Sequence, residues 1–137
     1  MILSQACKYG IRAIFHLAQG DDVRRLSMDI ARELHIPEPF LAKILQDLAR
    51  HEILQSTRGR GGGFKLARSL DQITPLEVAQ ALDPQFTVGC VLGPDACNEE
   101  DPCPLHSCWA PLKEELQDLL EGNSIRQILS AFHSESK

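Results

Sequence analysis

The chain has 137 residues, of which 43% are apolar, 5% aromatic and 24% charged, a composition that excludes an intrinsically disordered protein. No apolar run approaches the roughly 18–20 residues of a membrane-spanning helix, and residues 1–5 lack the basic start of a signal peptide, so we expect a cytoplasmic protein. The net charge is −5, but the charge is unevenly distributed. Residues 1–75 carry 11 basic and 8 acidic residues, whereas residues 76–137 carry 3 basic and 11 acidic residues. This asymmetry fits contact with DNA at one end only.

Three helices are predicted in the first fifty residues. Apolar residues at three- and four-residue spacing predict a helix over residues 4–19. They are Leu3, Cys7, Ile11, Ile14, Phe15 and Ala18. Ser27 is the expected N-cap of a second helix, and residues 35–37 form the turn before a third helix over residues 38–50, with Pro39 in its first turn. The residues expected inside are Ile30, Ala31 and Leu34 of the second helix and Phe40, Leu41, Ile44, Leu45 and Leu48 of the third.

A β-hairpin and a fourth helix are predicted next. Residues 53–57 are partly β-branched, residues 58–63 read Arg-Gly-Arg-Gly-Gly-Gly, and residues 64–66 alternate in polarity, which indicates two strands around a glycine-rich turn. Thr74 and Pro75 are the expected cap and first residue of the helix that follows.

The C-terminal half is predicted to contain a long loop and two helices. Residues 83–108 show no periodicity, and a loop of that length is usually functional or mobile. After it, apolar residues recur with a period of about 3.5 residues, the seam of a helix that packs against another helix. The seam residues are Leu105, Trp109, Leu112, Leu116 and Leu119. Gly122 ends this helix, and Ser124 caps the last one.

This order of elements is typical of a winged helix-turn-helix, so the predicted fold class is mainly α with a small β-hairpin wing and a long C-terminal dimerisation helix. The third helix is expected in the major groove of DNA, and Arg58 and Arg60 at the hairpin tip in a narrow minor groove. Lys65 and Arg68 are candidate phosphate ligands. The candidate DNA-binding residues are Ser27, Glu38, Pro39, Ala42, Lys43, Arg58, Arg60 and Lys65. A protein-interaction module without DNA binding is an alternative interpretation of the same elements.

Four of the five cysteines fall within 19 residues, which indicates a metal or redox site. The candidate ligands Cys90, Cys97, Cys103 and His106 follow the pattern Cys-x6-Cys-x5-Cys-x2-His. Thiolates suit iron–sulfur clusters or zinc, and these spacings are wider than the Cys-x2–4-Cys pairs of structural zinc sites. An iron–sulfur cluster is therefore favoured over a zinc site or a thiol redox switch. Cys108 rivals His106 as the fourth ligand, and Cys7 is expected in the core.

Four stretches together carry a family resemblance. They are residues 8–13 (Lys-Tyr-Gly-Ile-Arg-Ala), residues 27–37, residues 58–66 and the series Cys90, Cys97, Cys103-Pro-Leu-His106, Trp109. In these stretches the chain resembles the IscR/NsrR family of winged-helix iron–sulfur regulators. The resemblance implies a homodimer formed through residues 108–121, a palindromic operator, and gene control linked to iron–sulfur supply, iron, nitric oxide or redox stress. It also implies that Cys90, Cys97 and Cys103 are the cysteine ligands and that His106 matches the histidine ligand of the IscR branch.

The chain departs from the family pattern at three places. Lys8 stands where the NsrR branch can supply a carboxylate ligand from the partner's first helix. Ala42 stands where IscR-like proteins carry a glutamate on the recognition helix, so their operator sequence does not transfer. The interval from Cys90 to Cys97 is one residue longer than in IscR, so [2Fe–2S] is favoured by the histidine while [4Fe–4S] stays open.

The predicted function is a DNA-binding transcriptional regulator, acting on double-stranded operator DNA, whose affinity is switched by an iron–sulfur cluster. We expect a winged helix-turn-helix over residues 1–82, a cluster-binding loop over residues 83–107, and dimerisation and C-terminal helices over residues 108–137. The expected dimer contacts are Trp109, Leu112, Leu116 and Leu119. Since the sequence holds no Ser/His/Asp set, no paired carboxylates in a pocket-forming motif and no nucleotide-binding loop, an enzyme is not expected.

Overall fold

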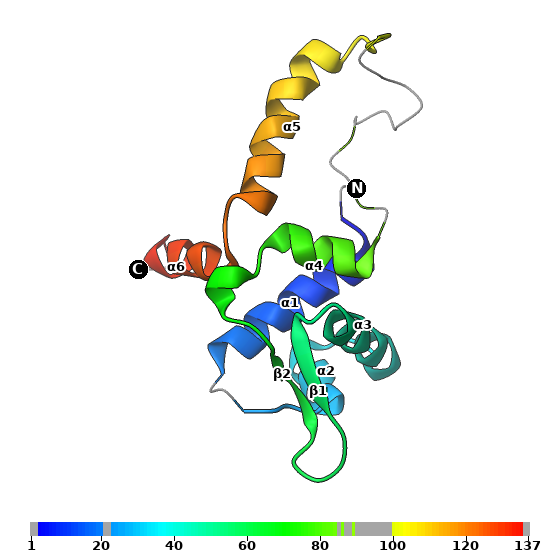
Figure 1. Cartoon of the computed structure of the whole chain (residues 1–137), viewed down its shortest axis with the longest axis vertical. Coiled ribbons are helices and arrows are strands. Elements are labelled where there is room, and N and C mark those ends of the chain that lie inside the picture. The colour runs from blue at the N-terminus through cyan, green and yellow to red at the C-terminus, as the bar shows by residue number, and fades with distance from the viewer. Residues whose placement is uncertain (1–2, 21–22, 85, 87–88, 90–99, 136–137) are drawn as a thin grey trace.

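The computed structural model describes residues 3–20, 23–84, 86, 89 and 100–135, and it is mostly helical with one β-hairpin (Figure 1). The elements are α1 (Gln5–Gln19), α2 (Ser27–Leu34), α3 (Glu38–Arg50), β1 (Leu54–Thr57), β2 (Gly63–Leu66), the 3₁₀ turn η1 (Leu70–Gln72), α4 (Pro75–Leu82), α5 (His106–Glu121) and α6 (Ile125–Glu135). This order confirms the predicted fold class. None of the described helices is long and apolar enough to cross a membrane.

Helix α1 lies at the centre of the molecule, where it packs against α3 and α4. Its buried residues are Cys7, Gly10, Ala13, Ile14 and Leu17. The predicted apolar face is confirmed, because Ile11 and Phe15 are half-buried and pack against the same core. Its most buried positions also include Gly10 and Ala13, which the sequence pattern did not single out. Small residues explain the difference: a Cβ atom on Gly10 would lie 2.2 Å from Leu82 Cδ1, so α4 approaches α1 where the sequence shows no large side chain.

Helices α2 and α3 form the helix-turn-helix, and a left-handed residue joins them. His35 ends α2 with φ 57° and ψ 45°, and the amide of Ile36 returns to the carbonyl of Ala31 over 3.0 Å. Two expectations were wrong here. The N-cap of α2 is Leu26 rather than Ser27. Phe40 is 40% exposed, because it lies at the flank of the buried stripe of α3 rather than within it.

The hairpin is antiparallel, and its strands pair Leu54 with Leu66 through Thr57 with Gly63. The segment before α2 adds to it, because Arg25 and Phe64 exchange two backbone hydrogen bonds of 2.9 and 2.8 Å. Gly63 makes this pairing possible. Its φ is 128°, and a Cβ atom there would lie 2.6 Å from the carbonyl oxygen of Arg25. The wing is thus joined to the helix-turn-helix by backbone contact.

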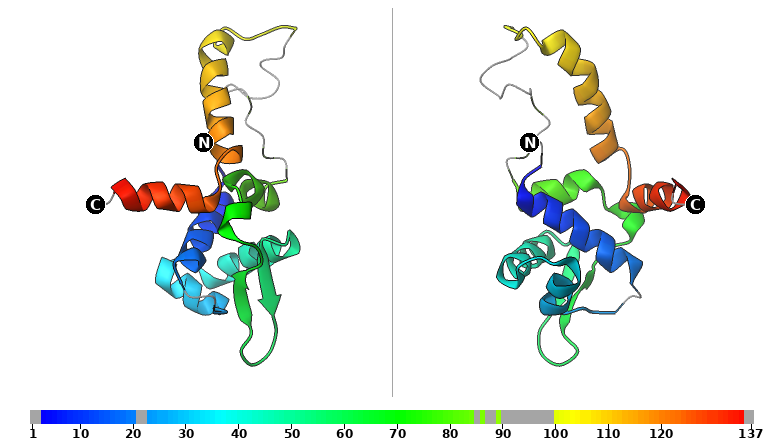
Figure 2. Two further views of the ribbon diagram at one scale, coloured as in Figure 1. Left: turned by 60° about the vertical axis from the view of Figure 1, so that its left-hand side comes forward. Right: turned by 180° about the vertical axis from the view of Figure 1, so that it is seen from behind.

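Helix α5 projects away from the rest of the molecule, on the side opposite the hairpin tip (Figures 1 and 2). Near its C-terminal end it is anchored by Leu120, which clusters with Cys7, Ala79 and Phe86. Leu105, just before the helix, and Leu112 and Leu119 within it are 43%, 55% and 52% exposed. The predicted seam is therefore largely uncovered in a single chain.

Helix α6 returns to the main core after the turn at Gly122. Its N-terminus is closed by a reciprocal cap, in which the Gln127 amide donates to Ser124 Oγ over 3.2 Å and the Ser124 amide donates to Gln127 Oε1 over 2.8 Å. Ile125 is buried in the core of α1 and α3, and its amide donates to the carbonyl of Ile73 over 2.8 Å. The predicted cap at Ser124 is confirmed.

We predict that Gly63→Ala lowers the free energy of unfolding by about 3 kcal/mol, because it adds a clash with the Arg25 backbone to an unfavourable φ. Gly61→Ala is the matched control in the same hairpin. Gly61 also has a positive φ, 71°, but no atom lies within 4 Å of its added Cβ, so we expect a loss of only about 1 kcal/mol. Urea denaturation of both variants measures the difference. Equal losses would contradict the assigned role of the Arg25 contact.

Candidate nucleic-acid interface and cysteine loop

Helix α3 presents one continuous face that the core leaves uncovered. Residues 39, 42, 43, 46 and 50 recur at three- and four-residue spacing, opposite the buried Leu41, Ile44, Leu45 and Leu48. Pro39, Lys43, Gln46 and Arg50 are exposed and Ala42 is partly exposed. Three of the predicted DNA-binding residues, Pro39, Ala42 and Lys43, therefore share one face. Sequence reasoning missed Gln46 and Arg50, although their spacing from Pro39 and Lys43 was a usable signal.

The N-terminal end of α3 is held in place from two sides. Ser27 Oγ donates to Glu38 Oε1 over 3.1 Å, so two predicted DNA-binding residues contact each other and join the starts of α2 and α3. On the other side, the rings of Phe40 and Tyr9 meet edge to face with centroids 5.5 Å apart. These contacts fix the orientation of α3 relative to α1 and α2.

Arg12 of α1 completes this support. Its guanidinium donates to the carbonyl of Leu34, at the end of α2, over 2.7 Å, and its Cζ lies 5.9 Å from the centroid of the Tyr9 ring. The stretch over residues 8–13 thus has a structural explanation. Tyr9 contacts α3, and Gly10 permits close packing of α4. Arg12 donates a hydrogen bond to a carbonyl at the end of α2 that has no partner within the helix.

A cluster of charges joins α1, α2 and the wing. Glu33 of α2 pairs with Arg25, next to the wing, and with His16 Nε2 of α1 at 2.5 Å. Loss of hydration raises the pKa of Glu33, but hydrogen bonds and charges from Arg25 and His16 outweigh it and hold this pKa below its ordinary value of 4.5. Glu33 therefore stays ionised and links the three elements that carry the helix-turn-helix.

The wing carries its positive charge at the tip. Arg58 and Arg60 are exposed, and Gly59 and Gly61 beside them have φ values of 86° and 71°. Lys65 lies elsewhere. It is half-buried at the base of the wing and lines a hollow of about 350 Å³ together with residues of α1 and with Arg126 of α6. Arg58 and Arg60 are thus placed to reach outward, whereas Lys65 faces a different surface.

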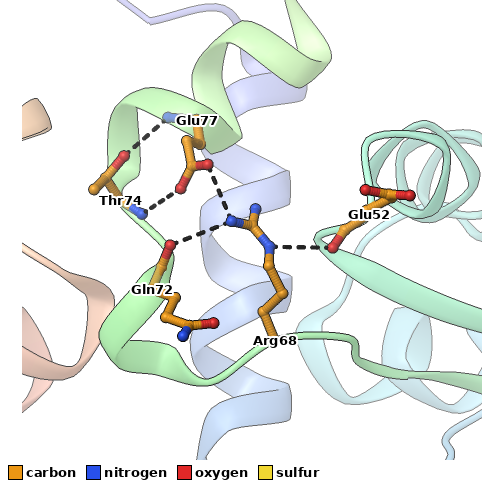
Figure 3. A network of polar contacts seen from close by, with 5 residues as sticks. All are labelled: Glu52, Arg68, Gln72, Thr74 and Glu77. Atoms are coloured by element: carbon orange, nitrogen blue, oxygen red, sulfur yellow. Dashed lines mark hydrogen bonds and ion pairs between the residues drawn. The ribbon is translucent and has the colours of Figure 1, made fainter.

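Arg68 serves a structural role that the sequence did not predict (Figure 3). Its guanidinium donates to the carbonyls of Glu52 and Gln72 over 3.2 and 3.3 Å and to Glu77 Oε1 over 3.1 Å. Glu77 also forms a capping box with Thr74 at the start of α4. The expectation that Arg68 binds phosphate is thus not supported by its position, because its Nε and Nη1 atoms hold the base of the wing against α4.

The cysteine loop is described only at its two ends. The predicted ligands Cys90 and Cys97 lie outside the described residues. Cys103 is buried and His106 is the first residue of α5, and the His106 amide donates to the Cys103 carbonyl over 3.0 Å. Cys108, the rival ligand, is exposed. Residues 100–106 therefore bring one predicted thiolate and the predicted imidazole into the same turn.

The other end of the loop is tied to the same helix. Trp109 Nε1 of α5 donates to the carbonyl of Gly89 over 2.8 Å, and Gly89 immediately precedes Cys90 in the sequence. Both described ends of the loop thus meet the first turns of α5. The described part of the chain, to which Cys90 and Cys97 do not belong, contains no group of three His, Cys, Asp or Glu side chains that could hold a metal ion.

Cys7 stands apart from this loop. It is buried between α1 and α4, where its Sγ lies 3.5 Å from the carbonyl of Ala79. The prediction that Cys7 belongs to the core is confirmed.

Comparisons with known proteins agree over nearly the whole chain. The family model of Rrf2, described as an iron-dependent transcriptional regulator, matches residues 3–131. A protein of Aquifex aeolicus, named as a candidate HTH-type transcriptional regulator, is 32% identical over 95% of the chain and 92% of its own length. The HTH-type transcriptional regulator IscR of Sodalis glossinidius is 26% identical over 95% of the chain and 79% of its own length.

Solved structures resemble this fold closely despite low sequence identity. CymR, described as the global cysteine regulator of B. subtilis, superposes with a TM-score of 0.77 at 18% identity, over 96% of the chain and 98% of its own. The IscR of T. potens gives a TM-score of 0.73 at 21% identity, over 100% of the chain and 92% of its own. At these identities the likeness establishes the fold.

We predict that the contribution of Glu33 to stability is lost in acid. A carboxylate whose pKa is lower in the folded than in the unfolded chain stabilises the fold above the unfolded value, and this effect disappears as the pH falls through the folded value. Glu33→Gln should therefore destabilise the chain near neutral pH, and the difference from the wild-type chain should shrink below about pH 4.5. Urea denaturation across this range measures it, with Glu114→Gln on α5 as control. A difference independent of pH would contradict the charge cluster.

Proposed function

We propose that this chain, which belongs to the Rrf2 family of transcriptional regulators, binds a palindromic operator as a homodimer. We also propose that an iron–sulfur cluster switches its affinity for DNA. The chain is a DNA-binding regulator and not an enzyme. The observation that carries the proposal further is the uncovered face of α3, whose N-terminal end is locked by Ser27, Glu38 and Phe40 while Pro39, Ala42 and Lys43 point outward.

In this proposal α3 lies in the major groove and the wing follows the adjacent minor groove. A recognition helix contacts base edges with its N-terminal residues, which is the end that Tyr9 and Arg12 support. Arg58 and Arg60 extend from the hairpin tip, where arginines favour the negative potential of a narrow minor groove. Lys65, half-buried at the base of the wing, contributes to the positive field more than to a direct contact.

The homodimer is supported by the exposed stripe of α5. Leu112 and Leu119 lie on one face with the half-buried Trp109 and Leu116, at the 3.5-residue period of paired helices. A second copy with the same stripe would cover both faces through a two-fold contact. Two α3 helices would then meet half-sites about one DNA turn, roughly 34 Å, apart, which accounts for a palindromic operator.

The three-part division of residues 1–82, 83–107 and 108–137 also belongs to this proposal. Residues 1–82 hold the recognition elements, and residues 108–137 hold most of α5 and all of α6. The parts are in contact, since Leu120 packs on Cys7 and Ile125 packs into the core of α1 and α3. A change at α5 can therefore act on the position of the DNA-binding elements.

The residues of the loop fit an iron–sulfur cluster. The turn over residues 103–106 offers a thiolate and an imidazole together, both of which bind iron, and Trp109 fixes Gly89 beside the same helix. Cys90, Cys97, Cys103 and His106 would hold the cluster, with [2Fe–2S] favoured and [4Fe–4S] open. A bound cluster would supply a cross-link between loop and helix that oxidants or nitric oxide can break.

Switching follows from where the loop lies in the chain. The loop connects the end of α4 to the start of α5. Ala79 of α4 also belongs to the hydrophobic core cluster in which Leu120 anchors α5. An iron–sulfur cluster bound by the loop would therefore set the angle between α5 and the helix-turn-helix. Because the two half-sites have a fixed spacing, a small change of this angle in both copies alters the fit to DNA.

We predict that replacing Arg58 and Arg60 together by Ala weakens operator binding by about tenfold and makes the slope of log affinity against log salt less steep by about 2. The reason is that each arginine beside a phosphate releases close to one counterion on binding. Arg126→Gln is the matched control, since Arg126 lies on α6 and pairs with Asp71 at 2.8 Å. Fluorescence anisotropy across a salt series measures the slopes. Unchanged operator binding by the double variant would contradict the contact of the wing with DNA, and no operator binding by the wild-type chain would favour a protein-interaction module.

We predict that the full chain purified without oxygen contains iron and acid-labile sulfide, and that Cys103→Ala and His106→Ala lose them. Cys108→Ala should retain both, because Cys108 is exposed outside the turn that joins Cys103 to His106. Metal analysis with an absorption spectrum gives the result. A colourless, iron-free wild-type chain would contradict the proposed cofactor, and one zinc ion per chain would replace it by a zinc site.

A further inference from the structure

The N-terminal part of the α3 recognition face is apolar. Pro39 and Ala42 occupy the two positions nearest the helix start, and neither side chain carries a hydrogen-bonding group. Donors appear only further along, at Lys43 and then at Gln46. The nearby carboxylate of Glu38 is held by Ser27, because its Oε1 accepts a hydrogen bond from the Ser27 hydroxyl.

More apolar surface lies beside this face than a polyanion alone would require. Met28 near the start of α2 and Phe40 in the first turn of α3 are 57% and 40% exposed, and the part of Phe40 that does not meet Tyr9 is open to solvent. The Ser27–Glu38 hydrogen bond joins these two helix starts, so the exposed side chains belong to one end of the helix-turn-helix. This end is continuous with the surface that meets DNA in a regulator of this fold.

We infer that α3 reads thymine through its C5-methyl group, with Ala42 and Pro39 as the contacting residues and Gln46 beside them recognising adenine. The inference rests on the proposed function, in which α3 enters the major groove. The thymine methyl is the one apolar group that base pairs present there, and alanine is a residue type that contacts it. A carboxylate at position 42 would instead accept a hydrogen bond from the N4 amino group of cytosine.

Gln46 strengthens the assignment because of its position. It lies one helical turn beyond Ala42 on the same face and is exposed. Glutamine forms two hydrogen bonds to N6 and N7 of adenine. A methyl contact and an adenine contact one turn apart on α3 would together select A·T-containing steps in each half-site, without any acidic residue.

The test uses the full chain and a duplex that it selects from randomised synthetic DNA. Each thymine of that duplex is then replaced in turn by uracil, which pairs identically but lacks the methyl group. We expect affinity to fall about three- to tenfold at one or two thymines of each half-site, the effect of one buried methyl group or slightly more. Ala42→Glu should abolish this sensitivity at one of them and change the selected pair to C·G.

Gln46→Ala is the matched control on the same face. It should weaken binding overall while the ratio of thymine to uracil affinities at the methyl-sensitive positions stays as in the wild-type chain. Equal affinities for every thymine and uracil duplex, or a selected site without thymine, would overturn this inference and leave the proposed function intact. Failure to select any duplex would overturn the proposed function itself. Circular dichroism checks that each variant is folded.

Discussion

Close packing around α1 is the constraint on which the rest of the molecule depends. One side of α1 meets α3 and α4 at Gly10 and Ala13, where there is no room for larger side chains, and its N-terminal end holds Cys7 against Leu120 of α5. The same helix supplies Tyr9 and Arg12 to the helix-turn-helix. In the proposed switch, a displacement of α5 would pass through this packing to the recognition helix, because protein interiors are close-packed and hard to compress.

The exposed leucines of α5 form an apolar surface that a second copy of the chain could cover. Leu112 and Leu119 are 55% and 52% exposed in the single chain, so each lacks about half of the free energy of full burial, roughly 1 kcal/mol. In the proposed homodimer, pairing with the same stripe of a second copy would recover that free energy. It would also hold two copies of α1, and with them two copies of α3, at a defined separation. The loop that would hold the proposed iron–sulfur cluster connects α4 to α5, so a bound cluster would act between the dimer contact and the DNA contact.

The sequence predicted the elements of this fold more reliably than their contacts. Helix α3 was placed with its observed limits because the prolines and the buried stripe both mark them, and Thr74 capped α4 as expected. The roles of Ser27 and Arg68 were missed because a serine before a helix and an arginine after a strand do not reveal which distant groups they contact. Gly10 was missed because small residues carry no hydrophobic signal.

The sequence also predicted some features of the candidate site and not others. Helical periodicity was enough to put Pro39, Ala42 and Lys43 on one face, and the same periodicity extended by one turn would have found Gln46. Spacing could not place Lys65, whose surroundings depend on α1 and α6 packing against the wing. Of the predicted ligands, Cys103 and His106 lie together, while the parts played by Cys90 and Cys97 stay predictions.

The most direct test of the account is the mass of the chain in solution, measured by light scattering, with and without Leu112→Glu and Leu119→Glu. We expect the wild-type chain to have twice its chain mass of 15.2 kDa, and the double variant to be a folded monomer that no longer binds a palindromic duplex tightly. Gln117→Glu, on α5 outside the leucine stripe, should remain dimeric. A wild-type chain that is monomeric at micromolar concentration, or a double variant that still dimerises, would contradict the central claim.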